Sequence, residues 1–324
     1  MMKKILSTLI KLAISGGILY FLFSSMDLAA FWETVKSVSP FAVIFVALFF
    51  IFIQSVSAYR WSLILSKDIE VRYPKLLSIY FVGMFFNNFL PTMVGGDLVK
   101  ALYLYRETGK GGLSLASIFM DRYSGFSALM SITAVALIPG YSLIKGTVLP
   151  GVFVFIIGGF VGASLVVWVG FLHSWAMNIL AKIHFYGINK KIDSFYRVLM
   201  GYKNHRDILV KIFSISLVVQ TGVIISCYVL SRGLGIDVGL AYFFLFIPLS
   251  IVVSMLPISV AGLGIREGAF VYLFTKVGAT KEEAITLSLM WFAMMVIVSL
   301  IGGVEFLRTG GKKGGITETP LEVE

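Results

Sequence analysis

The stretch FLPTMVGGDLVKALY, residues 89–103, decides the fold, because it interrupts a chain that consists mostly of apolar runs. It combines a proline, two adjacent glycines, an acid and a lysine, a composition that ends one helix and begins another. A second stretch, MLPISVAGLGIREGAF at residues 255–270, has a similar pattern. The two stretches align at Leu90/Leu256, Pro91/Pro257, Val94/Val260, Gly96/Gly262 and Lys100/Arg266. The chain is therefore predicted to contain two similar helix breaks, each carrying charge.

The composition is that of a membrane protein. Hydrophobic residues make up 58% and charged residues 14% of the chain, and the mean hydropathy is +0.93. A soluble domain has roughly 25% charged residues. The apolar runs are continuous and lack the alternation of a transmembrane barrel, so helices are expected to satisfy the backbone hydrogen bonds within the lipid. The predicted fold class is an all-α polytopic integral membrane protein.

Several kinds of chemistry are not expected from this sequence. The single cysteine, Cys227, excludes an internal disulfide and a cysteine metal cluster. His173, His184 and His205 lack the H-E-x-x-H spacing, and no G-x-x-x-x-G-K-[ST] loop occurs. We therefore expect no metal, no cofactor and no nucleotide-driven motor. The net charge of +10 is assigned to one membrane side rather than to nucleic-acid binding.

Six apolar runs are long enough to cross a bilayer, which takes about 20 residues; they cover residues 4–26, 41–65, 113–138, 149–172, 208–231 and 284–307. Two further runs, 76–90 and 240–256, end at the breaks and precede short helices at 97–107 and 265–275. The run at 76–90 would extend only about 22 Å at 1.5 Å per residue, against a core about 30 Å thick. A re-entrant hairpin is predicted there. The second run is longer and contains Pro248, so both a re-entrant and a fully spanning course remain open.

The basic residues support two re-entrant hairpins. With both hairpins re-entrant, twenty Lys and Arg residues fall on one side and five on the other, leaving Arg122 and Arg266 at membrane depth. The richer side is the cytoplasmic one. We therefore predict a prokaryotic cytoplasmic (inner) membrane protein with both termini in the cytoplasm.

This topology predicts an inverted repeat of two halves, each with three spans and one Pro/Gly-broken re-entrant hairpin, as in transporters whose broken helices meet near the midplane. The first repeat covers 1–140, with its hairpin at 76–107. The second covers 141–307, with its hairpin at 240–275 and a cytoplasmic amphipathic segment at 174–207. That segment lies on the inner leaflet or is a solvated linker. Residues 308–324 are predicted to be a disordered cytoplasmic tail.

Asp97 is the first candidate for function. It follows Gly95 and Gly96 at the start of a helix. One interpretation is an N-cap, in which its oxygens accept hydrogen bonds from free backbone N–H groups. The other is a ligand site, in which the glycines let the backbone approach a ligand and Asp97 binds an amine or carries a proton.

Arg122 lies about nine residues into the span at 113–138, where a charge costs roughly 2.5–3.5 kcal/mol. It is expected to face the bundle interior with Asp97 as its partner, since Asp121 points about 100° away around the helix. The alternative is an arginine that reaches back to the inner interface. Ser117 lies on nearly the same face.

The second break offers Ser259, Gly262, Gly264, Arg266 and Glu267. Arg266 and Glu267 are expected to pair with other groups or with Lys100 and Asp97 of the first break. The alternative is a charged edge at the outer interface.

Three further polar or small-residue features have ordinary explanations. Arg60 and Trp61 are interpreted as an anchor at the inner interface. Asn87 and Asn88 are expected to satisfy backbone groups freed by the break, with ligand contact as the alternative. Gly158 and Gly162 form G-x-x-x-G, which indicates helix packing.

Three motifs, NNFLPTMVGGDLVKALYL (87–104), SLASIFMDRYSG (114–125) and LPISVAGLGIREGAF (256–270), resemble the lysylphosphatidylglycerol synthase transmembrane-region family, also called the flippase-like domain family. The resemblance runs from Ile5 to Leu307. It implies lipid translocation, since a membrane region of this kind is assigned to moving lipid in members that also carry a transferase domain. The family's recurrent positions map to Arg60, Asn88, Pro91, Gly95, Gly96, Asp97, Lys100, Ser117, Asp121, Arg122, Pro257, Gly262, Gly264, Arg266 and Glu267. Lys100 and Ala261 depart from the commoner arginine and glycine.

The leading hypothesis is a lipid flippase-like transporter that acts on an anionic or zwitterionic membrane lipid. Arg122, Lys100 and Arg266 would hold a phosphate, and Asp97 and Glu267 an amine or a proton. An oligomer or a separate lipid-synthesising enzyme is an expected partner, and nucleic acid is not. The alternatives are a membrane-embedded transferase acting on phospholipid headgroups, with Asp97 or Glu267 as general base, and a scaffold that does not transport.

Overall fold

The computed structural model describes residues 16–18, 20–22, 24, 27–89, 95–171, 174, 196, 198–255, 259 and 262–310. Within these residues the chain forms helices and no strand. The helices are α2 (Leu28–Lys36), α3 (Pro40–Leu65), α4 (Tyr73–Phe89), α5 (Gly95–Thr108), α6 (Gly111–Ile144), α7 (Leu149–Trp168), α10 (Arg206–Gly233), α11 (Leu240–Ser254), α12 (Ile265–Phe274) and α13 (Lys281–Gly310).

Five described helices, α3, α6, α7, α10 and α13, are long and apolar enough to cross a membrane. They coincide with five of the six predicted spans, and the predicted all-α polytopic class is confirmed. The sixth, at 4–26, lies mostly outside the described residues. Local signals begin α3, where the Ser39 hydroxyl accepts a hydrogen bond from the Ala42 N–H and Pro40 occupies the first turn.

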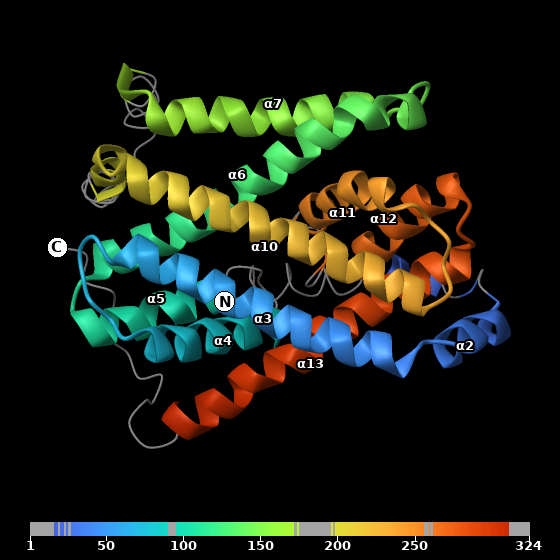
Figure 1. Cartoon of the computed structure of the whole chain (residues 1–324), viewed down its shortest axis with the longest axis horizontal. Helices are drawn as coiled ribbons and strands as arrows, with labels where there is room; N and C mark the ends of the chain where they lie inside the picture. Colours follow the sequence, from blue (N-terminus) through green and yellow to red (C-terminus); the bar gives the residue numbers. More distant parts are fainter. Residues whose placement is uncertain are drawn as a thin grey trace.

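The two breaks each join a pair of antiparallel short helices. Lys75, near the start of α4, pairs with Glu107, near the end of α5, with Nζ and Oε1 2.7 Å apart. The ring centres of Phe243, near the start of α11, and Phe274, at the end of α12, are 5.0 Å apart. Each pair therefore enters and leaves at one end of the bundle. Figure 1 shows α4 and α5 in one half of its length and α11 and α12 in the opposite half.

Helix length favours hairpins that do not span the membrane. At 1.5 Å per residue, the 17 residues of α4 extend about 25 Å and the 15 of α11 about 22 Å, both below the roughly 30 Å of a bilayer core. The second apolar run, which the sequence left open, thus has hairpin geometry. Two hairpins that enter from opposite ends fit the predicted inverted repeat, and the repeat relation itself stays a prediction.

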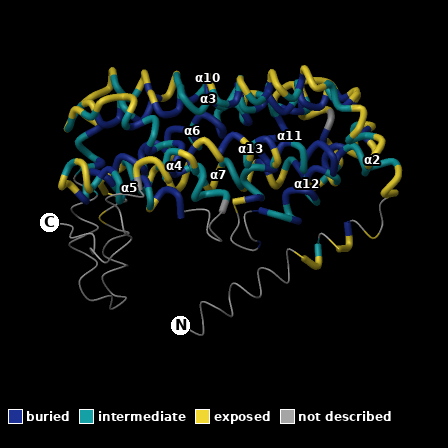
Figure 2. The backbone as a smooth tube through the Cα atoms, turned by 90° about the horizontal axis from the view of Figure 1, so that it is seen from below, coloured by how far each residue is buried: buried dark blue, intermediate teal, exposed yellow. Residues whose placement is uncertain are grey.

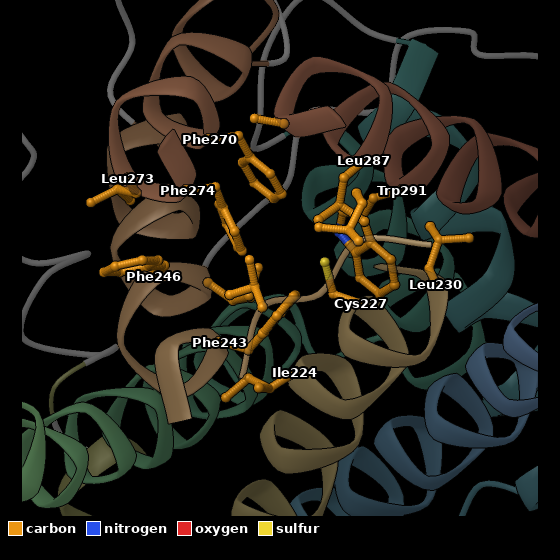
Figure 3. Packing of buried hydrophobic residues seen from close by; sticks show 14 of the residues in the cluster. Ile224, Cys227, Leu230, Phe243, Phe246, Phe270, Leu273, Phe274, Leu287 and Trp291 are labelled. Carbon is orange, nitrogen blue, oxygen red and sulfur yellow. The ribbon is translucent and has the colours of Figure 1, made fainter. Parts of the chain in front are cut away.

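An aromatic core fixes the second hairpin. Phe243, Phe246 and Phe274 are fully buried, and Figure 3 shows them in one cluster with Cys227 of α10 and Trp291 of α13. By contrast, α3 and α10 turn an apolar exposed side outward, and Figure 2 shows exposed residues gathered there. Such an apolar outer surface is what a lipid environment requires.

Helix α7 lies at the edge of the bundle (Figure 1). A Cβ atom built on Gly158 or Gly162 would meet no atom within 4 Å. The packing expected from their G-x-x-x-G spacing is therefore not made by the described residues of this chain. The packing role stays a prediction, because the spacing identifies a small-residue face and does not say which helix covers it.

Most of the predicted amphipathic segment at 174–207 lies outside the described residues, as do the first fifteen residues and the tail from 311. The described end of the segment packs on protein. The Tyr202 hydroxyl donates a hydrogen bond to the Ile64 carbonyl at 3.1 Å, and Leu199 is buried beside it.

Candidate functional site

A cavity of about 890 Å³ lies between the two hairpins. The first break contributes Asn87, Asn88 and Asp97 to its wall, and the second break contributes Arg266. Most other lining residues are apolar, among them Phe50, Ile118, Phe119, Val223, Ile247, Ile251, Phe270, Trp291, Phe292 and Met295. The two breaks, 166 residues apart along the chain by their aligned prolines, therefore border the same space.

Arg122 of α6 pairs with Asp97 of α5, as expected from the sequence. Its Nε donates to Asp97 Oδ2 at 2.7 Å and its Nη2 to Oδ1 at 3.0 Å. This two-point geometry is the strong form of an arginine–carboxylate contact. The Arg122 side chain is nevertheless 50% exposed, because it borders the cavity. The alternative, an arginine that reaches back to the interface, is wrong.

Asp97 lies in the first turn of α5, which begins at Gly95. Its carboxylate is occupied by Arg122 and by Lys100, whose Nζ is 3.2 Å from Oδ1. The backbone N–H of Gly96 donates to the Asn87 side-chain oxygen at 2.9 Å. Asn87 thus satisfies a freed backbone group, as the sequence predicted, and the Gly96 N–H is not available to a ligand.

The glycines of the first break serve packing. A Cβ atom on Gly96 would lie 1.9 Å from the carbonyl oxygen of Gly83 in α4. Only glycine permits the two backbones to cross so closely. The interpretation of Gly96 as a residue that lets a ligand approach is therefore replaced by helix–helix contact. Gly95 beside it is buried as well.

Lys100 lies behind Asp97, away from the cavity lining. Its ammonium nitrogen is 3.7 Å from Asp121 Oδ2, and it stands 4.6 Å from the ring centre of Tyr80 and 5.6 Å from that of Trp61. Lys100 therefore bridges the two carboxylates and is also stabilised by aromatic faces.

Arg60 is a buried partner of Asp121, which corrects its interpretation as an interfacial anchor. Its Nε and Nη2 donate to Asp121 Oδ1 at 3.0 and 2.8 Å, and its Nη1 donates to Ser216 Oγ at 2.9 Å. Arg60 is 4% and Asp121 2% exposed. Position near a helix end suggested an anchor, whereas a carboxylate on α6 draws the side chain inward.

Trp61 and Ser117 are also turned into the protein. The Trp61 indole N–H donates to Ser117 Oγ at 3.2 Å, and Ser117 donates to the Ser114 carbonyl at 2.9 Å. Both side chains are fully buried. Ser117 thus holds Trp61 in place and does not line the cavity.

We call Arg60, Asp97, Lys100, Asp121 and Arg122 the Asp97 cluster.

The second break has its own cluster, formed by Arg266, Glu267 and Ser288, which we call the Glu267 cluster. Arg266 Nε donates to Glu267 Oε1 at 3.0 Å and to Ser288 Oγ at 3.1 Å. Ser288 in turn donates to Glu267 Oε1 at 3.1 Å. The Arg266 guanidinium lies 4.4 Å from the ring centre of Phe292.

These contacts correct the alternative of a charged outer edge, since Arg266 is 6% and Glu267 0% exposed. They also differ from the suggested pairing with Lys100 and Asp97, because adjacent residues at the helix start satisfy one another. Glu267 Oε2 further accepts the Gly264 N–H at 2.6 Å and so caps α12.

Gly262 and Gly264 take left-handed backbone angles, with φ of 77° and 85°. Side chains other than glycine are strained there. Ser259 is buried, and its hydroxyl has no hydrogen-bond partner in the described part of the chain. Ser250 of α11 shares this property and lines the cavity.

Asn88 reaches across to α13, where its side-chain N–H donates to the Met295 carbonyl at 3.5 Å. Sequence reasoning missed four other polar residues on the wall, Gln54, Gln220, Ser250 and Ser254. Gln220 donates to the Gly125 carbonyl at 3.1 Å. The two glutamines are isolated amides in otherwise apolar spans, and that rarity is a signal that could have identified them.

Comparison with known proteins gives the family. Residues 8–303 match the family described as the lysylphosphatidylglycerol synthase TM region. The chain belongs to this family. The match covers both hairpins, the spanning helices α3, α6, α7 and α10 in full, and α13 as far as residue 303.

A similar family protein comes from Methanothermobacter thermautotrophicus. It is described as a UPF0104 membrane protein and is 27% identical over 311 residues, covering 87% of this chain and 88% of its own length. The membrane region thus corresponds nearly end to end in the two proteins.

Proposed function

We propose that this protein moves a lipid with a phosphate-bearing headgroup between the leaflets of a prokaryotic cytoplasmic membrane, with both termini in the cytoplasm. The observation that carries the proposal is the shared cavity, reached by one hairpin from each end of the bundle. Each hairpin region brings one arginine to its wall, Arg122 beside the first break and Arg266 at the second. Arginine is the side chain best suited to hold a phosphate at two points.

The remaining wall suits the rest of a lipid. Ligand pockets hold roughly 300–1,000 Å³, and the cavity, at about 890 Å³, is at the upper end of that range. Its lining is largely apolar, with the polar side chains at the breaks. An amphiphile with a charged head and an apolar body fits this division better than a fully polar solute does.

The packing suggests which parts stay fixed. In α10, a Cβ atom on Gly222 would lie 2.3 Å from Ile53 Cδ1, and one on Gly233 would lie 2.5 Å from Ala42 Cβ. Helices α3 and α10 therefore form a close-packed pair. Rocking of the hairpins against this pair would open the cavity toward one leaflet and then the other, as in transporters built from broken helices.

The test is transbilayer movement in proteoliposomes. Fluorescent phosphatidylglycerol, aminoacylated phosphatidylglycerol and a polyprenyl phosphate would be followed with and without a proton gradient. We expect movement of at least one lipid by the unchanged protein and its loss in Arg122→Gln. The matched control is Arg308→Gln, which makes the same chemical change at a side chain that is 76% exposed, and it should retain movement.

Two results would overturn the proposal. One is the absence of movement for every lipid under both conditions. The other is a chemically altered lipid, detected by mass spectrometry, which would favour the membrane-embedded transferase.

A further inference from the structure

The charges of the two clusters beside the cavity do not sum to zero. The Asp97 and Glu267 clusters together contain four cations and three carboxylates: Arg60, Lys100, Arg122 and Arg266 against Asp97, Asp121 and Glu267. One positive charge is therefore uncompensated among these described side chains. An unpaired charge at low dielectric is costly, so this arrangement favours a bound anion.

The surplus positive charge belongs to the Asp97 cluster, and Arg122 is the cation of that cluster that is exposed to the cavity. Arg266 and Glu267 compensate each other, whereas three cations share the two carboxylates of the Asp97 cluster. The side chains of Arg60, Asp97, Lys100 and Asp121 are each less than a tenth exposed, while that of Arg122 is 50% exposed. A ligand in the cavity would therefore meet the surplus charge at Arg122.

We propose that Asp97 occupies the place on Arg122 that the ligand's anion would take, and that a headgroup with one net negative charge replaces it there. Asp97 then keeps its contact with Lys100. This inference rests on the proposed function for the lipid nature of the ligand, and it adds the ligand's net charge and the manner of its binding.

Geometry and charge support the exchange. Asp97 presents two oxygens to Nε and Nη2 of Arg122, and a phosphodiester presents two oxygens in a similar fork. Lys100 Nζ is already 3.2 Å from Asp97 Oδ1, so the Asp97 carboxylate would keep its ion pair with Lys100 after it leaves Arg122. A monoanion would make the two clusters neutral, whereas a zwitterion would leave the surplus and a cationic lipid would increase it.

The first experiment compares lipids that differ in charge and share the same acyl chains. Purified protein would be titrated with dioleoyl phosphatidylglycerol (net charge −1), phosphatidylcholine (0) and lysylphosphatidylglycerol (+1), and binding read by native mass spectrometry. We expect phosphatidylglycerol to bind about tenfold or more tightly than the other two, equivalent to one charge-assisted contact. Equal binding, or tighter binding of the cationic lipid, would overturn the exchange.

Variants separate the exchange from general attraction to basic surfaces. Arg122→Gln should abolish the preference for phosphatidylglycerol, and Arg308→Gln should leave it intact. If Arg122→Gln keeps the preference, the anion binds elsewhere and the proposal is wrong.

Asp97→Asn gives the sharpest result, because it removes the competitor from Arg122. Phosphatidylglycerol should then bind about tenfold more tightly. Asp237→Asn is the matched control, because it makes the same chemical change at a side chain that is 92% exposed and lies outside both clusters. We expect a change of less than about threefold there. Equal effects of the two variants would mean that only net charge matters. A selective loss of lysylphosphatidylglycerol binding in Asp97→Asn would mean that Asp97 binds an amine. Either result contradicts the exchange.

Binding is measured without transport, so the two proposals can fail separately. Charge-selective binding without movement in proteoliposomes would remove the transport proposal and leave the exchange. Transbilayer movement without charge-selective binding would remove the exchange and leave the transport proposal.

Discussion

At the scale of single residues, the described charged side chains near each break form ion pairs within their own cluster. Arg122 shares Asp97 with Lys100, and Arg60 and Lys100 share Asp121. Removal of one partner from such a pair leaves an uncompensated buried charge, which costs more than removal of both. The first two predictions follow from this arrangement and from the glycine contacts behind it.

The Arg60–Asp121 pair should be strongly coupled. Arg60→Met is expected to lower the free energy of unfolding by about 3–5 kcal/mol, because Asp121 loses its closest cation. The double variant Arg60→Met/Asp121→Leu should lose less than the sum of the two single losses. Unfolding in a denaturing detergent, analysed as a double-mutant cycle, measures the coupling. Additive losses would contradict the pairing.

The close crossing of α4 and α5 should not tolerate a methyl group. Gly96→Ala places a Cβ atom 1.9 Å from the Gly83 carbonyl oxygen, so a loss of about 1–3 kcal/mol is expected. The control is Gly158→Ala, where a Cβ atom meets nothing within 4 Å, and where stability should stay within about 0.5 kcal/mol. Thermal unfolding of both variants decides the matter, and equal melting temperatures would refute the contact.

At the scale of elements, the two helical hairpins are the distinctive units. Each contains a helix shorter than the expected thickness of a bilayer core, and each is held at its open end, the first by Lys75 and Glu107 and the second by Phe243 and Phe274. The interior ends of both bring polar side chains to the cavity. Backbone groups without a helical partner are tolerated at membrane depth where protein or a water-filled space satisfies their hydrogen bonds. Here the side chains of Asn87 and Glu267 accept hydrogen bonds from such backbone N–H groups.

Chemical labelling should reveal the opposite entry of the hairpins. Cysteines replacing Lys75 and Glu107 should react with a membrane-impermeant maleimide from one side only. Cysteines replacing Asp237, before α11, and Lys276, after α12, should react only from the other side. Native Cys227 is fully buried and should contribute little background. Labelling of Lys75→Cys and Glu107→Cys from different sides would show that α4 and α5 together cross the membrane once, which contradicts the hairpin.

At the scale of the whole molecule, eight described helices enclose the cavity. Helices α3, α4, α5, α6, α10, α11, α12 and α13 all contribute to its wall. Helix α7 does not line it and remains at the edge, with an exposed apolar surface. The cavity borders the aromatic core, because Phe270 and Trp291 belong to the core cluster and also line the cavity.

Filling the cavity should block function without unfolding the protein. Ile251→Trp adds bulk at the wall, so lipid binding and transbilayer movement should fall at least about tenfold while the melting temperature changes little. Val154→Trp makes a larger side chain on the exposed face of α7 and should leave both unchanged. Normal movement in Ile251→Trp would show that lipid takes another route.

The sequence by itself determined the class of the fold and the position of its elements. Long apolar runs require helices in lipid, and the ends of α3, α7, α10 and α13 follow the runs closely because hydrophobicity and helix-breaking residues act locally. Two hairpins at the Pro/Gly breaks follow from the same local rules. The partner of Arg122 could also be predicted, since few carboxylates are available at that depth.

Only the tertiary structure decided which side chains meet. A helical pattern gives the direction of a side chain around its own axis and does not say which helix lies opposite. Arg60 therefore looked like an anchor and is a buried partner of Asp121, and Gly96 looked like a ligand contact and serves a helix crossing. Gln54 and Gln220 went unnoticed for the same reason. The shared cavity depends on long-range packing of two breaks that are distant along the chain, and local chemistry does not encode that meeting.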